Sequence, residues 1–319
     1  MKRHIVLKYT FSIFLFIYVV LANSTVNFAQ DKFYCLTGAF IADIPAKKDI
    51  ANFKKDYGKK PYVVMVFIDW GRVVSGNVID DVYTEDCVLM VTWEPWDAVN
   101  KKEIDYDGLL NGKYDNYIKR FAKQLKEIKK TVLLRFAHEM NGNWYPWAGT
   151  KIGKDKYIKV YKYVKDIFDK EKAYNVKWIF SINWEDIPKE NNHFTIYYPG
   201  SEYVDYIGID GYNWGATQSW SRWLSFKDLF YSVYEEISSK YKKPVIISEF
   251  SCASKGGDKV KWIKEAMGNI KNMPNIKAFV LFNKDKEVDW RFPPDKLPGK
   301  ELKIQLEDPY FKYKGNTRI

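Results

Sequence analysis

Short runs of β-branched and aromatic residues alternate with longer amphipathic segments over most of the chain. Each run is nearly continuous in apolar residues, as is typical of parallel strands that are buried on both faces. We predict eight such strands, at Tyr34–Phe40, Tyr62–Asp69, Val88–Trp93, Thr131–Ala137, Val176–Asn183, Tyr206–Tyr212, Val245–Phe250 and Lys277–Phe282.

The segments between these runs carry apolar stripes with helical spacing. The stripes are clear after the third, fourth, sixth and seventh strands, where they begin at Tyr114, Tyr157, Phe230 and Trp262. The helices expected after the first, second and fifth strands are marked less clearly. Eight strand–helix units in one α/β domain fit a (β/α)₈ TIM barrel better than an open doubly wound sheet. The first strand is also not followed by the Gly-rich turn of a dinucleotide-binding fold.

The N-terminus has the features of a targeting segment. Lys2, Arg3 and Lys8 precede an apolar run over 11–22, and a small residue, Ala29, follows at a plausible cleavage point. This pattern predicts a signal peptide over residues 1–29, a catalytic domain over 30–319, and export. An uncleaved membrane anchor is the alternative.

Charge and cysteine content exclude several other classes of protein. The net charge of +11 comes from lysines spread singly and in pairs, which indicates solvated helix faces rather than a nucleic-acid-binding patch. The three cysteines, Cys35, Cys87 and Cys252, are too few and too scattered for a disulfide framework or a zinc site. Cys35 and Cys87 could pair, although we expect buried free thiols.

Two carboxylates follow predicted strands directly. The fourth strand runs into His138-Glu139, and the seventh runs into Glu249. Strand ends meet at the C-terminal face of a barrel, so both carboxylates are expected at its mouth, nearly opposite each other. Glycosidic hydrolysis needs such a pair, and their separation decides between retention and inversion at the anomeric carbon. The alternative for Glu139 alone is a structural bond to Arg135 or His138.

Tryptophan is concentrated near the predicted strand ends. Aromatic residues make up 18% of the chain, and an indole ring can stack on the apolar face of a sugar. Trp178 and Trp262 lie within predicted elements and are assigned to the core. The tryptophans expected in loops, some of which will only pack on neighbouring loops, are Trp93, Trp96, Trp144, Trp147, Trp184, Trp214, Trp220 and Trp223.

These motifs together resemble glycoside hydrolase family 26. The stretch Arg135–Gly142 with Trp144 and Trp147 is similar to the acid/base signature of that family, while Val91–Trp96, Asp210–Gly215 and Ile247–Phe250 match its third, sixth and seventh strands. The resemblance covers nearly the whole mature chain. It implies a TIM barrel and retaining hydrolysis of β-mannan, mixed-linkage β-1,3-1,4-glucan or β-1,3-xylan.

The resemblance also implies residue roles. Glu139 would be the acid/base and Glu249 the nucleophile, with Tyr212 donating a hydrogen bond to Glu249 and His138 and Arg135 flanking the pair. The expected substrate-binding residues are His138, Arg135, Tyr212, Trp144, Trp147, Trp214, Trp96 and Trp290.

The finer resemblance is to the lichenase-type members of the family. It rests on Trp93–Trp96, Asp210–Trp220 and Lys286–Arg291, and it predicts an endo-β-glucanase for mixed-linkage glucan, with an endo-β-1,4-mannanase as the alternative. One departure is that strand eight ends Leu281–Lys284, without the expected Trp or His, so Trp290 is the candidate for that platform.

Two other classes fit the sequence less well. A catalytically inactive carbohydrate-binding barrel would lack one of the glutamates, and a metal-dependent hydrolase would need clustered ligands, whereas the chain has three histidines. We expect no metal and no other cofactor. The expected protein is a monomer that binds polysaccharide, with no nucleic acid and no membrane contact beyond the signal segment.

Overall fold

The computed structural model describes residues 34–311, so the predicted signal peptide lies outside the described residues. Eight parallel strands close into a barrel in the order β1-β10-β9-β8-β7-β6-β3-β2. The predicted TIM barrel is thereby confirmed. The strands are β1 (Leu36–Phe40), β2 (Val63–Asp69), β3 (Val88–Glu94), β6 (Val132–Phe136), β7 (Val176–Asn183), β8 (Tyr206–Asn213), β9 (Val245–Cys252) and β10 (Ile276–Phe282).

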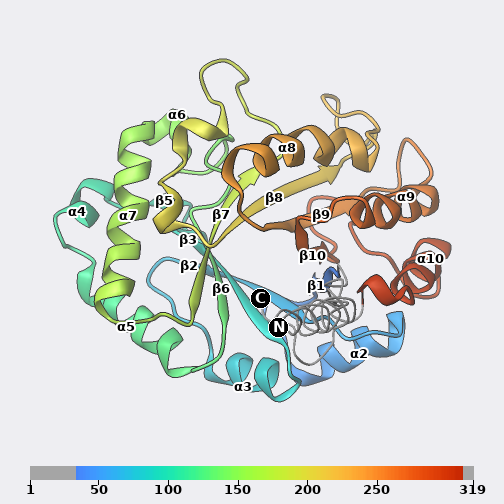
Figure 1. Cartoon of the computed structure of the whole chain (residues 1–319), viewed down its shortest axis with the longest axis horizontal. Helices are drawn as coiled ribbons and strands as arrows, with labels where there is room; N and C mark the ends of the chain where they lie inside the picture. The colour runs from blue at the N-terminus through green and yellow to red at the C-terminus, as the bar shows by residue number, and fades with distance from the viewer. Residues whose placement is uncertain (1–33, 312–319) are drawn as a thin grey trace, which may run out of the picture. The chain divides into compact units, whose positions relative to one another are not determined.

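Helices flank the barrel on its outside (Figure 1). The longer ones are α2 (Lys47–Tyr57), α3 (Gly76–Thr84), α5 (Asp115–Glu127), α7 (Lys154–Lys170), α8 (Phe226–Tyr241), α9 (Lys259–Lys271) and α10 (Leu297–Leu306). The short helices α4 (Tyr106–Leu110) and α6 (Gly149–Ile152), and the small ribbon of β4 (Trp96–Asp97) and β5 (Lys102–Glu103), lie in the connections.

The helix expected after the fifth strand is absent. The connection between β7 and β8 holds only two 3₁₀ turns, η1 (Phe194–Tyr197) and η2 (Ser201–Tyr203). Pro188, Pro199 and Gly200 lie in this segment, and proline and glycine both disfavour a continuous helix. The prediction of a helix here was therefore wrong.

The helices form where the sequence supplies caps and apolar stripes. Ser225 caps α8, since its hydroxyl accepts from the Asp228 N–H at 3.1 Å while the Asp228 carboxylate accepts from the Ser225 N–H at 2.9 Å. The predicted stripes of α5, α7, α8 and α9 are buried against the sheet.

Side chains alternate between two parts of the core along each strand. On β6, Leu134 and Phe136 pack in the cluster between sheet and helices, whereas Leu133 packs in the cluster inside the barrel. Arg135 shares the side of Leu133 and is completely buried. On β8 the outward residues are Ile207 and Ile209, so Asp210 faces inward.

Some aromatic residues and all three cysteines belong to the core. Trp93 lies within β3, is 0% exposed and stacks on Trp70 at 4.9 Å, so its assignment to a loop was wrong. The strand continues to Glu94, one residue further than predicted. Cys35, Cys87 and Cys252 are buried free thiols, which leaves no pairing between the first two.

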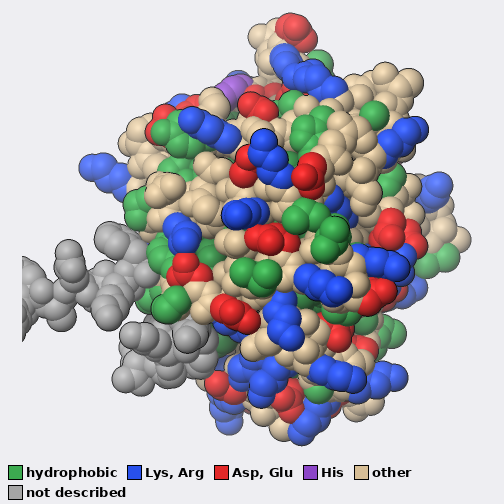
Figure 2. All heavy atoms as spheres, turned by 90° about the vertical axis from the view of Figure 1, so that its right-hand side faces the viewer, with side chains coloured by type: hydrophobic (Ala, Val, Ile, Leu, Met, Phe, Trp, Pro, Cys, Tyr) green, Lys and Arg blue, Asp and Glu red, His purple; other side chains and the backbone are tan. Residues whose placement is uncertain are grey.

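The exterior is charged without a single dominant sign on the face seen in Figure 2. Lys and Arg side chains are scattered there among Asp and Glu side chains. Elsewhere on the described surface, opposite charges also form pairs, such as Lys271 Nζ with Asp308 Oδ2 at 2.8 Å. Between Tyr34 and Phe311, no helix combines the length and apolar character that crossing a membrane requires.

Candidate active site

A cavity of about 480 Å³ opens at the C-terminal ends of the strands. Its walls include both predicted glutamates, Glu139 and Glu249, which arrive from β6 and β9 respectively. The rest of the wall is rich in aromatic rings, with Phe67, Tyr145 and Phe282 among those that the sequence analysis did not single out.

Glu139 is presented by an unusual stretch of backbone. In the turn that follows β6, Ala137 and Glu139 have φ angles of 49° and 54°, in the left-handed region that non-glycine residues rarely adopt. The Glu139 N–H donates to the Ser181 carbonyl on β7 at 2.9 Å, which ties the turn to the neighbouring strand. Trp144 Nε1 donates to Glu139 Oε2 at 2.8 Å. The carboxyl group is thus held in the cavity wall by both its main chain and its side chain.

Glu249 lies in β9 next to an irregularity in the sheet. The pairing of β8 with β9 shifts register after Ile209, so that Asp210 pairs with Glu249. Arg135 Nη1 donates to Glu249 Oε1 at 2.8 Å, and the Tyr212 hydroxyl donates to Glu249 Oε2. Both oxygens of the carboxylate therefore have a donor from inside the barrel.

Arg135 forms the centre of an ion-pair chain. Its Nη2 donates to Asp210 Oδ2 at 2.6 Å while Nη1 is bonded to Glu249. One guanidinium thereby compensates part of the charge of two buried carboxylates, in the fork geometry that arginine alone provides. Asp210 was not singled out as a site residue. Its position two residues before Tyr212, on the same face of a strand, was the available signal.

The environment of Glu139 differs from that of Glu249. Burial, and after it the neighbouring charge of Glu249, raise the pKa of Glu139 to about 8. A second buried acid nearby, Glu94, has its pKa raised to about 7, again mainly by burial. Glu139 is therefore protonated near neutral pH and has a proton to donate.

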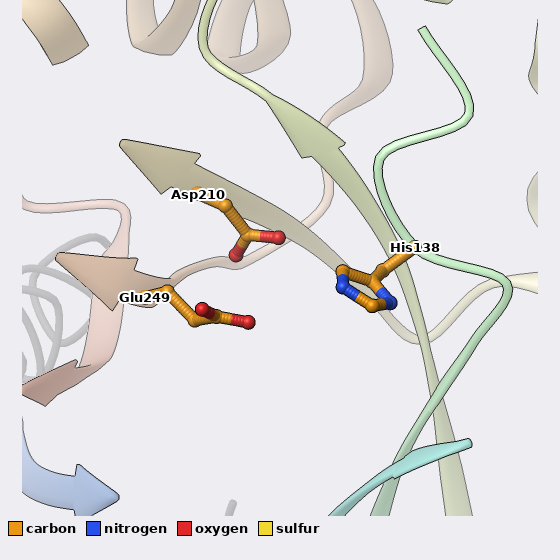
Figure 3. Close-up of side chains that lie close together, drawn as sticks. All are labelled: His138, Asp210 and Glu249. Atoms are coloured by element: carbon orange, nitrogen blue, oxygen red, sulfur yellow. The ribbon is translucent and has the colours of Figure 1, made fainter. Parts of the chain in front are cut away.

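His138, Asp210 and Glu249 point toward one another (Figure 3). One ligand atom from each lies within 4.8 Å of the others, which is compatible in distance with a metal site. However, Arg135 already donates to both carboxylates, and its charge would repel a cation placed between them. Burial lowers the pKa of His138 well below its usual value, so the ring is neutral. Its Nδ1 has no hydrogen-bond partner among residues 34–311.

The predicted tryptophans separate into two groups. Trp144, Trp214 and Trp290 line the cavity, together with Trp184 and Trp220, and Trp220 is 69% exposed.

Trp147 and Trp96 do not line the cavity, contrary to the prediction. Trp147 is 0% exposed, stacks behind Tyr145 at 4.3 Å and donates to the His138 carbonyl at 2.6 Å. Trp96 is half-buried, and its Nε1 donates to Glu94 Oε2 at 3.0 Å. Both rings support the wall from behind because Tyr145 takes the position facing the cavity.

The end of the eighth barrel strand, β10, places a different aromatic ring at the expected position. Phe282, the last residue of β10, lines the cavity where a Trp or His was expected. Trp290 comes from the following loop and packs on Tyr212 at 4.8 Å and on Trp214 at 4.8 Å. Lys286 from the same loop also lines the cavity and was not predicted.

Comparison with known proteins assigns the chain to a family. The family model described as glycosyl hydrolase family 26 matches residues 41–234, more than half of the chain. Endoglucanase H of Acetivibrio thermocellus is 40% identical over 262 residues, which is 80% of this chain but 28% of that protein. A mannan endo-1,4-beta-mannosidase of Bacillus subtilis is 37% identical over 100 residues, 28% of this chain and 25% of that protein. The matched regions thus span under a third of the length of each of these two relatives.

Solved structures agree with the fold. A Bacillus subtilis mannanase superposes with a TM-score of 0.66 at 16% identity, covering 91% of each chain. A β-mannanase of Bacteroides ovatus gives a TM-score of 0.65 at 15% identity, covering 90% of this chain and 95% of that one. The match to the family model and the barrel architecture lead to the same conclusion: the chain belongs to glycosyl hydrolase family 26.

Proposed function

We propose that this chain is a retaining endo-β-glycanase that hydrolyses mixed-linkage β-1,3-1,4-glucan. The observation that carries the proposal is the pair of buried glutamates in one cavity, one with a raised pKa and the other bonded to Arg135 and Tyr212. Glycoside hydrolysis by double displacement requires this division between a protonated acid and a charge-compensated nucleophile.

In the first step, Glu139 gives its proton to the glycosidic oxygen as an oxygen of Glu249 bonds to the anomeric carbon. The bond between that carbon and the glycosidic oxygen breaks, and the leaving sugar departs as an alcohol. Glu139, now ionised, then takes a proton from water, whose oxygen displaces Glu249 from the anomeric carbon. Two inversions give net retention.

The other residues orient the pair and the sugar. Arg135 and Tyr212 fix the two oxygens of Glu249. Neither Arg135 nor His138 lines the cavity, so both act from behind its wall rather than by touching the sugar. Trp144 and Trp214 present ring surfaces to the cavity, where the apolar faces of successive sugars can stack.

The choice of glucan over mannan rests on the relatives. The similarity to a protein named endoglucanase H extends over 80% of this chain, whereas the similarity to the named mannanase of Bacillus subtilis extends over 28%. An endo-β-1,4-mannanase with the same two glutamates is the second candidate, since several relatives carry that name.

The substrate is tested by initial rates on barley β-glucan, lichenan, glucomannan, galactomannan and xylan. We expect fast cleavage of the two mixed-linkage glucans and none of galactomannan. Cleavage of galactomannan instead would show that the enzyme is an endo-β-1,4-mannanase. Proton NMR of the first product should show the β-anomer, and an α-anomer would overturn the retaining mechanism.

The two roles are tested by separate variants. Glu249→Ala should abolish turnover with the fold intact, and azide should restore cleavage of an activated glycoside with formation of an inverted glycosyl azide. Glu139→Ala should retain activity only on substrates with good leaving groups. Glu265→Ala, on the exposed side of α9, is the control and should match the parent protein. Normal cleavage of polysaccharide by either active-site variant would refute its assigned role.

We also propose that residues 1–29 direct export. Expression of the full chain in a secreting host should place a protein beginning near Gln30 in the medium, as read by intact mass. Recovery of an uncleaved protein in the membrane fraction would instead indicate an anchor.

A further inference from the structure

The segment Trp290–Phe292 forms part of the cavity wall. Trp290 reaches the cavity while packing against Tyr212, and Tyr212 donates to Glu249. The position of the Trp290 ring therefore bears on both the sugar site and the hydroxyl that orients the nucleophile. Because the segment belongs to a long loop after β10, something must fix it to the barrel.

Side chains from neighbouring elements donate hydrogen bonds to the carbonyls of this segment. Ser251 Oγ on β9 donates to the Trp290 carbonyl at 2.7 Å, and the Tyr57 hydroxyl on α2 donates to the Phe292 carbonyl at 2.6 Å. Lys259 Nζ donates to the Arg291 carbonyl at 2.8 Å and reaches the Trp290 carbonyl at 3.4 Å. The same ammonium lies 4.4 Å from the centre of the Phe292 ring.

Lys259 occupies a position that is unfavourable for a cation. It is the first residue of α9, where the helix dipole favours negative charge, and it is only 5% exposed. No carboxylate forms a salt bridge with it among the described residues, although Asp289 faces it from the loop. Its ammonium is instead satisfied by the carbonyls and the aromatic face of the 290–292 segment. The contacts of the Lys259 ammonium are therefore mainly with that segment.

We propose that Lys259 is a positioning residue that clamps the main chain of residues 290–292 and thereby holds Trp290 against Tyr212 in the active-site wall. The proposal rests on the proposed function, because its effect on turnover is exerted through the cavity described above. Lys259 itself does not line that cavity.

The protonation of Lys259 provides a signature that a purely structural residue lacks. The pKa of Lys259 is lowered to about 8, mainly by burial; Cys252 and Asp289 oppose this shift, and the Arg291 charge adds a smaller lowering. The adjacent Asp258 caps α9 and accepts from the Val260 and Lys261 N–H groups. Above pH 8 the clamp loses its charge, which weakens its hydrogen bonds and its contact with Phe292.

The kinetic test compares three variants on the best polysaccharide of the panel at pH 7. Lys259→Met should lower kcat/KM by about tenfold because two buried carbonyls lose a charged donor. Lys259→Arg should restore most of the activity, since a guanidinium can donate to both carbonyls. Lys261→Met, two residues along the same helix and exposed in a pair with Glu265, should match the parent protein. Unchanged kcat/KM in folded Lys259→Met would overturn the proposal.

The pH test removes the titration of the catalytic acid. In a Glu139→Gln background, the affinity for a glucan oligosaccharide should weaken several-fold between pH 7 and pH 9.5 when Lys259 is present. It should weaken much less when Lys259→Arg is added, because the titration of Glu94 is common to both proteins. Equal pH dependence in the two proteins would count against the clamp. This comparison uses only folded proteins, so it stands even when Lys259→Met fails to fold.

A spectroscopic readout separates this proposal from the proposed function. In the Glu139→Gln background, where the catalytic acid no longer titrates, the ¹⁹F resonance of 5-fluorotryptophan at position 290, assigned with Trp290→Phe, should shift with a midpoint near pH 8. The shift near pH 8 should be lost when Lys259→Arg is added. An inactive parent protein that shows this shift would sink the proposed function and leave the clamp standing. An active protein without the shift would contradict the clamp and leave the proposed function standing.

Discussion

At the scale of single residues, Arg135 has the most demanding environment in the barrel. It is completely buried, and it bonds Asp210 and Glu249 at once. Burying a charge is costly unless it is paired and hydrogen-bonded, and a chain of two acids and one arginine meets that condition. The arginine therefore serves the orientation of Glu249 as much as it serves stability.

Arg135→Lys tests the need for a forked donor. A lysine ammonium is a point donor that cannot reproduce the two contacts to Glu249 and Asp210 at once, so we expect kcat to fall about 100-fold with little change in far-UV circular dichroism. Arg72→Lys, in a surface pair with Asp69, is the control and should leave kcat unchanged. Near-parental kcat in Arg135→Lys would show that orientation of Glu249 does not depend on the fork.

Glu139 should also make the stability of the protein depend on pH. Its pKa is raised in the folded state, so its contribution is complete below the unfolded pKa of 4.5 and is lost as pH rises toward 8. Relative to the parent, Glu139→Gln should thus become more stable over this range, by a few kcal/mol in total, since one pKa unit is about 1.4 kcal/mol. Urea denaturation at pH 4.5 and pH 8 measures the difference, and a constant difference would contradict the expectation.

At the scale of elements, the strand ends decide where chemistry is possible. β6 and β9 deliver Glu139 and Glu249 to the same cavity because all strands of the closed barrel run in one direction. The sequence was sufficient to predict this, since buried parallel strands appear as apolar runs and the residue after each run must lie at the mouth.

The parts that could not be predicted depend on contacts between elements. Trp147 follows β6 as Trp144 does, but Trp147 is covered by the rings of Tyr145, Trp96 and His138. Similarly, the pairing of Arg135 with Asp210 requires the register between strands that are distant in sequence. Local pattern gives the side of a strand on which a residue lies, but it does not give the partner.

The barrel interior leaves no space for a side chain at Gly208 on β8. A Cβ there would lie 2.3 Å from Ser248 Oγ and 2.5 Å from Ser181 Oγ. Gly208→Ala should therefore destabilise the protein by about 1–3 kcal/mol through overpacking. Gly268→Ala on α9 is the matched change in open space, and it should stabilise by up to about 1 kcal/mol because alanine favours helix. Thermal unfolding of both variants measures the two signs, and a neutral Gly208→Ala would mean that the strands can separate to admit a methyl group.

At the scale of the whole molecule, the three cysteines lie in separate parts of one core. Cys35 precedes β1, Cys87 precedes β3 and Cys252 ends β9, and each is at most 3% exposed. Burial raises the pKa of both Cys87 and Cys252 to about 12. A thiol that is both inaccessible and protonated reacts very slowly.

Thiol labelling should therefore report opening of the barrel. With an aromatic disulfide reagent at pH 8, we expect no fast reaction of the native protein and rapid reaction of three thiols in denaturant. Single-cysteine variants should react at similar slow rates, since the core opens as a unit. A thiol that reacts quickly in the native protein would identify a part of the barrel that opens by itself.

The hydrogen bonds between the first and last strands have a consequence for biosynthesis. β1 pairs with β10 from Leu36 with Ala278 to Phe40 with Phe282, so nearly all of the described chain emerges between these partners. Such distant pairing makes folding slow, and until it forms, both strands present unpaired edges to other chains. The ribosome must therefore synthesise β10, which begins at Ile276, before the barrel can close. Nascent chains that stop earlier are expected to need a chaperone to avoid aggregation.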